Sequence, residues 1–254
     1  MTDASLTGAP TGGAPADARP LRVAAIGDVH ASPSARGRWR DTFMELSHAA
    51  DVVCLCGDLT NHGTVAEAEA LAEDLRGCTV PVLAVLGNHD HHCGCPEDVE
   101  RVMREAGVKF LEDEVHTVGG VGFAGVKGFA GGFDGRMLDA FGERAVKAFV
   151  KEALDEAMRL EHALKSLETE RTVVVLHYAP IAKTVAGEPE AILPFLGSSR
   201  LAETIDRFHG IRAVFHGHAH HGTYEGRTRA GVPVFNVAAP IAKPNGKPYA
   251  LIEV

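Results

Sequence analysis

The sequence lacks several features that would place it in a specialised class of protein. None of its apolar runs approaches the roughly 20 residues of a membrane-spanning helix. Its five cysteines, an odd number in a chain of 254 residues, argue against a disulfide framework and favour free thiols in a reducing compartment. There is no block of consecutive basic residues. The formal net charge of -9 therefore disfavours binding to long nucleic acid or to an anionic membrane.

The first residues, 1 to about 19, contain no apolar segment. A secretory signal needs basic residues followed by an apolar stretch of roughly 7–15 residues. We therefore expect residues 1–19 to be a disordered tail and the protein to be cytoplasmic. A content of 45% hydrophobic and 23% charged residues suits a single α/β domain over residues 20–254.

Three apolar runs near the start of the chain predict parallel strands. They cover residues 22–26, 51–56 and 80–86, and helical patterns over 33–50 and 65–76 separate them. A polar residue follows each run at intervals of 30, namely Asp28, Asp58 and Asn88. This interval is typical of a βαβ unit, whose right-handed crossover brings the carboxyl ends of the strands to one edge of the sheet.

The later part of the chain predicts a second sheet with its own helices. We expect two sheets packed face to face with helices outside, an α/β fold in which the strand order stays open. The long helix could cap a pocket together with the Gly-rich stretch, over about 119–168, or it could be a scaffold helix. The expected elements are a helix at 96–106, two short strands at 114–126 turning at Gly119-Gly120, a mobile Gly-rich loop at 128–135, a one-faced helix at 138–167, an interrupted helix at 189–208, and strands at 172–176, 211–215, 232–237 and 249–254.

Five of the predicted strands end in residues that bind metals or move protons. Singly, a carboxylate after a strand is more often a turn or helix-cap residue, and a histidine is more often a satisfied core residue. Together, five such strand ends indicate a metal site. The stretches are Gly27-Asp28-Val29-His30, Gly57-Asp58, Gly87-Asn88-His89-Asp90, His177, and His216-Gly217-His218-Ala219-His220.

Taken in order, these stretches resemble the five-part signature of the calcineurin-like metallophosphoesterases, over residues 28 to 220. The resemblance implies a two-layer β-sandwich flanked by helices, with a dinuclear metal site. One departure is Ala31, where many members of the family have glycine, but this position is not a ligand. The implied roles are Asp28, His30 and His220 for the first metal, Asn88, His177 and His218 for the second, Asp58 as the bridge, and His89, oriented by Asp90, just outside the metals.

This ligand set is chemically consistent with hydrolysis of a phosphate ester. Two divalent ions would carry about four positive charges, and two carboxylates return only about two, so the centre would attract a phosphate anion. A hydroxide held between the metals could attack phosphorus in line, and His89 as imidazolium could protonate the leaving alkoxide. The mixed Asp, His and Asn donors suit Mn, Fe or Zn.

The function expected from these features is that of a metal-dependent phosphodiesterase acting on small phosphodiesters or cyclic nucleotides. A phosphomonoesterase for a nucleotide or sugar phosphate is the alternative, and a nuclease or a non-catalytic metal-binding scaffold is less favoured. The partner is therefore a small phosphate ester, without a membrane or long nucleic acid, and the sequence leaves the oligomeric state open.

Three further features lie near the predicted site. Asn61, His62 and His91 could contact substrate, although Asn61 and His62 could equally form a turn ahead of a helix. Cys93 and Cys95 could belong to a separate zinc site, but their spacing favours a loop at the rim of the pocket. The G-x-G-x-x-G pattern over 120–125 is followed by no predicted helix, so a dinucleotide site is disfavoured.

Overall fold

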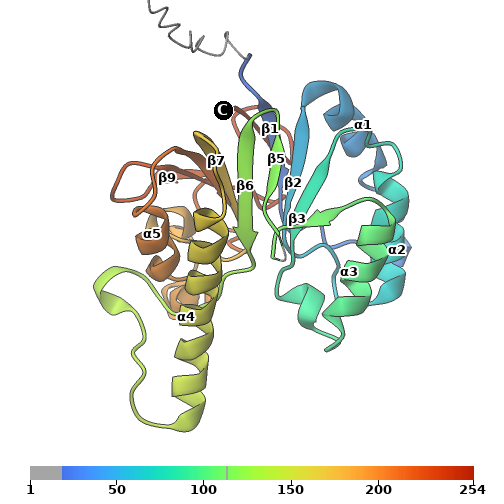
Figure 1. Ribbon diagram of the computed structural model, residues 1–254. Coiled ribbons are helices and arrows are strands. Elements are labelled where there is room, and N and C mark those ends of the chain that lie inside the picture. The colour runs from blue at the N-terminus through green and yellow to red at the C-terminus, as the bar shows by residue number, and fades with distance from the viewer. Residues whose placement is uncertain (1–18, 113) are drawn as a thin grey trace, which may run out of the picture.

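The computed structural model describes residues 19–112 and 114–254, which form two β-sheets packed face to face (Figure 1). The first sheet contains, in spatial order, β11 (Ala250–Glu253), β1 (Arg22–Ile26), β2 (Val52–Cys56), β3 (Val82–Val85) and β4 (Lys109–Phe110). The second contains β5 (His116–Val118), β6 (Val121–Val126), β7 (Arg171–Leu176), β8 (Ile211–His216), β10 (Pro233–Asn236) and β9 (Glu225–Arg227).

Helices cover the outer side of both sheets, so the predicted two-layer sandwich flanked by helices is confirmed. Those on the first sheet are α1 (Arg40–Ala49), α2 (Val65–Leu75) and α3 (Pro96–Glu105), and those on the second are α4 (Arg144–Lys165) and α5 (Ser199–Ile205). Short 3-10 turns are η1 (Pro33–Ala35), η2 (His89–His91), η3 (Asp134–Arg136), η4 (Ala182–Val185) and η5 (Glu190–Phe195). In the described part of the chain, no helix is long and apolar enough to cross a bilayer.

The central strands are buried on both faces, which explains their continuous apolar runs. In β2, Val53 and Leu55 pack under the helices of the first sheet, whereas Cys54 and Cys56 face the core between the sheets. Phe215 of β8 meets them from the second sheet, so alternate residues of one strand join the two layers.

The parallel strands bring their carboxyl ends to one edge of the sandwich. β1, β2 and β3 are parallel neighbours, as predicted, and β6, β7, β8 and β10 are parallel neighbours in the second sheet. The polar stretches therefore enter the same region from both layers. The loop after β2 is fixed further by a capping box at α2, in which Thr64 and Glu67 each accept the other's backbone N–H.

Several predicted boundaries are wrong, and each has a local cause. The helix expected over 33–50 begins only at Arg40, because the chain first makes η1 and then bends at Gly37 with φ of +84°. The helix expected from 138 begins at Arg144, and Phe141, which lies within the expected range, is 83% exposed. The helix expected over 189–208 is interrupted, as predicted, and is divided into η5 and α5.

The remaining predicted segments are the Gly-rich stretch, the short strands and the N-terminal tail. The Gly-rich stretch 128–135 contains the start of η3 rather than loop alone. The short strands β4 and β9 are not evident in the sequence pattern, since they have two and three residues. The hairpin of β5 and β6 turns at Gly119-Gly120, as predicted, and both glycines have positive φ. The predicted N-terminal tail lies outside the described residues, except for Arg19, which pairs with Asp51.

Candidate metal centre

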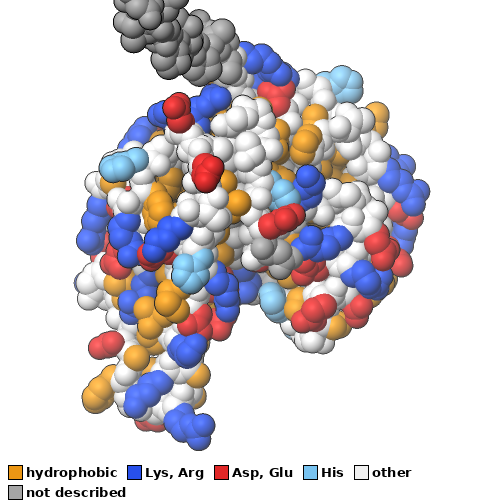
Figure 2. Space-filling model, in the orientation of Figure 1, with side chains coloured by type: hydrophobic (Ala, Val, Ile, Leu, Met, Phe, Trp, Pro, Cys, Tyr) orange, Lys and Arg blue, Asp and Glu red, His pale blue; other side chains and the backbone are white. Residues whose placement is uncertain are grey.

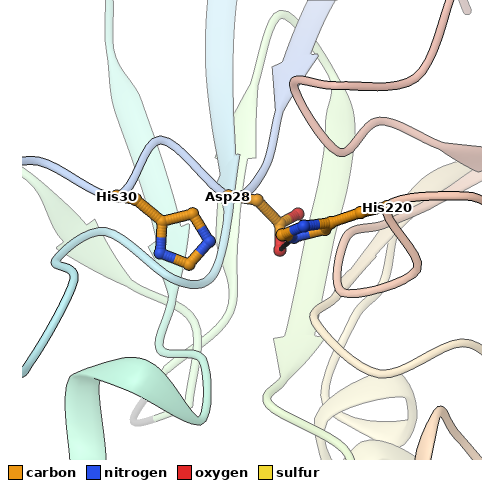
Figure 3. Close-up of side chains that lie close together, drawn as sticks. All are labelled: Asp28, His30 and His220. Carbon is orange, nitrogen blue, oxygen red and sulfur yellow. Dashed lines mark hydrogen bonds and ion pairs between the residues drawn. The ribbon is translucent and has the colours of Figure 1, made fainter. Parts of the chain in front are cut away.

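The first group of candidate ligands joins the end of β1 to the loop after β8. It consists of Asp28, His30 and His220, whose potential ligand atoms all lie within 4.8 Å of one another. His220 Nε2 lies 2.9 Å from Asp28 Oδ1. In the view of Figure 3, Asp28 lies between His30 and His220. Asp28 and His220 are therefore in hydrogen-bond contact, although they lie about 190 positions apart in the chain.

Asp58, at the end of β2, belongs to two further groups of the same kind. One contains His30 and His89, and the other contains His177 and His218. The Asp58 side chain is buried, with His30 Nε2 3.8 Å from Oδ2 and His177 Nε2 3.4 Å from Oδ1. One carboxylate thus lies between histidines from both sheets.

Asn88 reaches the group of Asp58, His177 and His218 from the end of β3. Its Oδ1 lies 2.9 Å from His177 Nε2. The other ring nitrogen of His177, Nδ1, lies 2.9 Å from the carbonyl oxygen of Cys56 and can donate to it. That bond would leave Nε2 as the acceptor nitrogen, which is the form that binds a metal. All seven predicted ligand positions are therefore brought to one edge of the sandwich.

Three glycines at strand ends leave room for a candidate ligand from another strand. The pairs are Gly57 with His177, Gly87 with Asp58, and Gly217 with Asp28. A Cβ on these glycines would lie 2.4, 2.2 and 2.3 Å, respectively, from the nearest atom of the paired side chain. The motif glycines are therefore part of the packing of the centre, a role that their sequence position alone does not reveal.

The backbone at the centre is unusual as well. Outside glycine, positive φ costs about 1–2 kcal/mol per residue, so such residues concentrate at functional sites. Two residues of the centre with positive φ, Asp28 and His30, are held by backbone hydrogen bonds to the loop after β2. Asp28 N–H donates to Gly57 O, and His30 N–H donates to Asp58 O, each at 3.0 Å. Among the described residues, positive φ outside glycine occurs at Asp28, His30, Asp58, Asp134 and His218, four of which belong to the groups above.

The two carboxylates of the centre have opposite pKa shifts. Burial raises the pKa of Asp58, and the nearby negative charge of Asp28 raises it further. For Asp28, burial acts in the same direction, but the hydrogen bond from His220 and the nearby His177 and His220 rings, in their protonated forms, outweigh it and lower the pKa. Two buried carboxylates this close repel each other, and a bound cation would relieve that repulsion.

Three of the four candidate ligand histidines provide neutral ligand nitrogens, whereas the hydrogen bond to Asp28 raises the pKa of the fourth, His220. Burial lowers the pKa of His30 and His177, and it lowers that of His218 to about 3. These rings are therefore uncharged at neutral pH, with a lone pair available. His30 Nδ1 is buried and has no hydrogen-bond partner among the described residues. Neutral imidazoles, an amide oxygen and two buried carboxylates fit a pair of borderline metal ions.

His89 belongs to the group of His30 and Asp58, but the predicted orientation by Asp90 is wrong. The His89 Nδ1 atom lies 2.7 Å from the backbone oxygen of Asn61, and its ring packs at 4.5 Å on that of His30. Asp90 is fully buried beneath the site, where its carboxylate accepts bonds from the N–H groups of Thr60 and Gly87. Asp90 therefore ties the loops after β2 and β3 together instead of contacting the reacting groups.

The three candidate substrate residues have different positions. Asn61 contributes its backbone oxygen to His89, as above. His62 is exposed, and its Nδ1 lies 3.0 Å from Glu67 at the start of α2, which agrees with the turn alternative. His91 is exposed in η2, directly after His89 and Asp90.

The cysteines of the rim do not form a second site in the described structure. Cys93 is exposed and Cys95 is partly exposed, and both are free thiols. Neither belongs to a group of candidate metal ligands within the described ranges. The rim-loop interpretation of this stretch is the one that agrees with the structure.

Two residues that the sequence analysis did not single out lie at the same edge. Lys127 directly follows β6, and its backbone oxygen accepts the N–H groups of both His177 and Tyr178. The Tyr178 ring lies 4.5 Å from that of His218. The available signal was positional: each residue follows an apolar strand, but neither is of a typical metal-binding type.

Comparison with known families agrees with this geometry. The profile of the calcineurin-like phosphoesterases matches residues 21–222. The chain belongs to this family. It is accordingly a metallophosphoesterase, a hydrolase of phosphoric esters. None of the curated protein sequences matches the chain at a significant level.

Solved structures share the fold of this phosphoesterase at low sequence identity. A phosphopantetheinyl hydrolase of Mycobacterium tuberculosis is 17% identical with a TM-score of 0.65, covering 93% of this chain and 96% of its own. A dimetal phosphatase of Danio rerio is 13% identical with a TM-score of 0.62, covering 93% of both chains. GAP50, an anchor in the inner membrane complex of Plasmodium, is 12% identical with a TM-score of 0.51, covering 90% of this chain and 75% of its own.

Proposed function

We propose that the chain is a two-metal phosphodiesterase for small phosphodiesters or cyclic nucleotides. The observation that carries the proposal is the position of Asp58, whose carboxylate belongs to two groups of candidate ligands. A carboxylate with two oxygens can bind two ions at once. Paired ions a few ångströms apart are a common arrangement for in-line displacement at phosphorus.

Each residue then has a defined task. Asp28, His30 and His220 would hold one ion, Asn88, His177 and His218 would hold the other, and Asp58 would bridge them. When bound, the ions supply positive charge to the phosphoryl oxygens and lower the pKa of water at the site. His89 is part-buried and close to His30, so it can bind a phosphoryl oxygen or protonate the departing alkoxide.

Charge supports a small anionic substrate. Two divalent ions and two carboxylates leave the centre with about two positive charges in a protein whose formal net charge is -9. Basic and acidic side chains are interspersed over the face shown in Figure 2, instead of forming one basic stripe there. A long polyanion would therefore gain little beyond the reacting phosphate.

The types of ligand atom and the free thiols support the proposed metals and the proposed cytoplasmic location. Imidazole, carboxylate and amide donors without thiolate favour Mn, Fe or Zn. All five cysteines are free thiols, which fits a reducing, cytoplasmic setting.

A phosphomonoesterase is the second candidate, favoured by the similarity to a dimetal phosphatase. The same metal core would serve both reactions, since they differ in the groups around the phosphate. A non-catalytic scaffold is a third possibility, because the fold also occurs in an anchor protein. Against it, all candidate ligands and His89 are retained here.

The test uses metal-stripped protein resupplied separately with Mn, Fe, Zn or Mg. Hydrolysis of bis(4-nitrophenyl) phosphate and of 4-nitrophenyl phosphate would be measured side by side, for the wild type and for Asp58→Asn. We expect metal-restored activity that favours the diester and is lost in the variant. Preference for the monoester would support the second candidate, and no turnover with filled metal sites would support the scaffold.

A further inference from the structure

Aromatic side chains form a continuous chain of ring contacts that starts at the metal centre. Ring centroids lie 4.5 Å apart for His218 and Tyr178, 5.8 Å for Tyr178 and Phe129, and 4.9 Å for Phe129 and Phe149. Phe149 in turn lies 6.2 Å from Phe195 in an edge-on arrangement. We call Tyr178, Phe129, Phe149 and Phe195 the aromatic wall.

The aromatic wall returns to the metal centre through the backbone. His218 Nε2 lies 3.2 Å from the carbonyl oxygen of Phe195, the last residue of the wall. The series of contacts therefore begins at the His218 ring and returns to His218 through the backbone of Phe195. Its members come from the end of β7, the loop after β6, helix α4 and η5, so the wall joins four separate segments beside the site.

Two charged residues hold the segment that carries Phe129. Lys127 Nζ lies 5.1 Å from the Phe129 ring centre and 5.5 Å from that of Tyr178, within cation–π distance of both. The buried carboxylate of Glu156, on α4, accepts the backbone N–H of Gly128 at 2.6 Å. Helix α4 thus positions the loop in addition to supplying Phe149.

The outer part of the aromatic wall is open to solvent. Phe195 is 55% exposed, and its neighbour Ile192 is 40% exposed, whereas Phe129 and Phe149 are partly buried. Phe195 meets Phe149 edge-on, its backbone oxygen is one hydrogen bond from the candidate ligand His218, and more than half of the residue stays exposed to solvent. Exposed aromatic surface at the edge of a polar site marks a place where an apolar group binds.

We propose that the aromatic wall receives a planar aromatic group of the substrate, joined to the reacting phosphoryl group through an ester oxygen. The inference depends on the proposed function, since it assumes that the metal centre holds the phosphoryl group. Aromatic rings stack on or meet one another edge-on with a gain beyond simple burial. A nucleobase or a phenolic ring has the required shape, and an alkyl or sugar group alone does not.

The test measures binding without turnover. Benzylphosphonate, methylphosphonate and cyclohexylmethylphosphonate carry the same anionic group on a non-hydrolysable P–C bond. Their Kd values for the full-length, metal-loaded protein would be measured by calorimetry. The variants are Phe195→Ala, which removes the exposed ring, and Phe149→Leu, which keeps apolar volume but loses the aromatic face. Phe141→Ala is the matched control, because Phe141 is 83% exposed and lies outside the wall.

We expect the wild type and Phe141→Ala to bind benzylphosphonate roughly ten-fold more tightly than methylphosphonate, with cyclohexylmethylphosphonate in between. Phe195→Ala and Phe149→Leu should reduce this preference about 3- to 10-fold and leave methylphosphonate binding unchanged. An unchanged preference in both variants, or equal binding of the benzyl and cyclohexylmethyl compounds, would overturn the inference. Failure of the wild type to bind any phosphonate would overturn the proposed function and this inference with it.

Discussion

A Cβ atom on Gly57 would lie 2.4 Å from Nδ1 of His177, so the glycine before one candidate ligand leaves the space that another ligand occupies. The two residues belong to different sheets and are 120 positions apart. Their contact ties the end of β2 to the end of β7, and His177 Nδ1 also lies 2.9 Å from the backbone oxygen of Cys56. Each strand end is thus positioned by its counterpart in the other sheet.

Replacing Gly57 with alanine tests this relationship. We expect Gly57→Ala to lose metal from the His177 side and to destabilise the fold by about 2–4 kcal/mol, from steric overlap and positive φ together. Gly94→Ala separates the two causes, because Gly94 has φ of +75° but open space around its Cβ position. It should cost only about 1 kcal/mol and keep its metal. Metal analysis and thermal unfolding would measure both, and equal behaviour of the two variants would contradict the packing argument.

Replacing His89 separates catalysis from metal binding. We expect His89→Ala to keep both metals and lose about 10²- to 10⁴-fold in kcat, because the variant lacks the group that binds or protonates oxygen. His92→Ala is the control, since His92 is exposed nearby and contacts His62. Metal content and steady-state kinetics give the answer. Normal turnover would remove His89 from the mechanism, and loss of a metal would make it a ligand instead.

We expect Asp90 to stabilise the loops after β2 and β3 without taking part in the reaction directly. Its carboxylate accepts the backbone N–H groups of Leu59, Thr60 and Gly87. In Asp90→Asn, an amide nitrogen would face one or more of these donors, so we expect a loss of about 2–3 kcal/mol in the free energy of unfolding. Denaturant unfolding measures this, with exposed Asp98→Asn as control. Unchanged stability with reduced kcat would return Asp90 to a direct catalytic role.

The site was easier to predict from the sequence than the boundaries of the fold. Asp28, Asp58 and Asn88 directly follow apolar strands, and parallel strands meet at one edge, so their convergence follows from local pattern and chain topology. The orientation of His89 by Asn61 was not predictable, because it depends on the path of a loop. The aromatic wall was missed for the same reason. Phe149 matched the apolar stripe of a helix, and only the packed structure places it beside Phe129 and Phe195.

A buried carboxylate beside β3 should make stability depend on pH. Glu112 accepts the N–H of Leu86 at 2.8 Å, and its other oxygen is buried without a partner among the described residues. Burial raises the pKa of Glu112 to about 8. Between its unfolded pKa and that value, the folded state binds one more proton than the unfolded state, so stability falls as pH rises.

Glu112→Gln should remove this dependence. From pH 5 to pH 8 we expect the wild type to lose about 2–4 kcal/mol relative to the variant. Exposed Glu190→Gln should follow the wild type. Unfolding by denaturant at several pH values would be compared for the three proteins, and parallel curves for wild type and Glu112→Gln would contradict the prediction.

The number of metal ions per chain tests the two-metal centre directly. The wild type and Asp58→Asn would be loaded with Mn, freed of excess metal and assayed for bound metal, with electron paramagnetic resonance recording whether the ions are magnetically coupled. We expect two coupled ions per chain in the wild type and at most one, uncoupled, in Asp58→Asn. A single ion in the wild type, or two coupled ions in both proteins, would contradict this expectation.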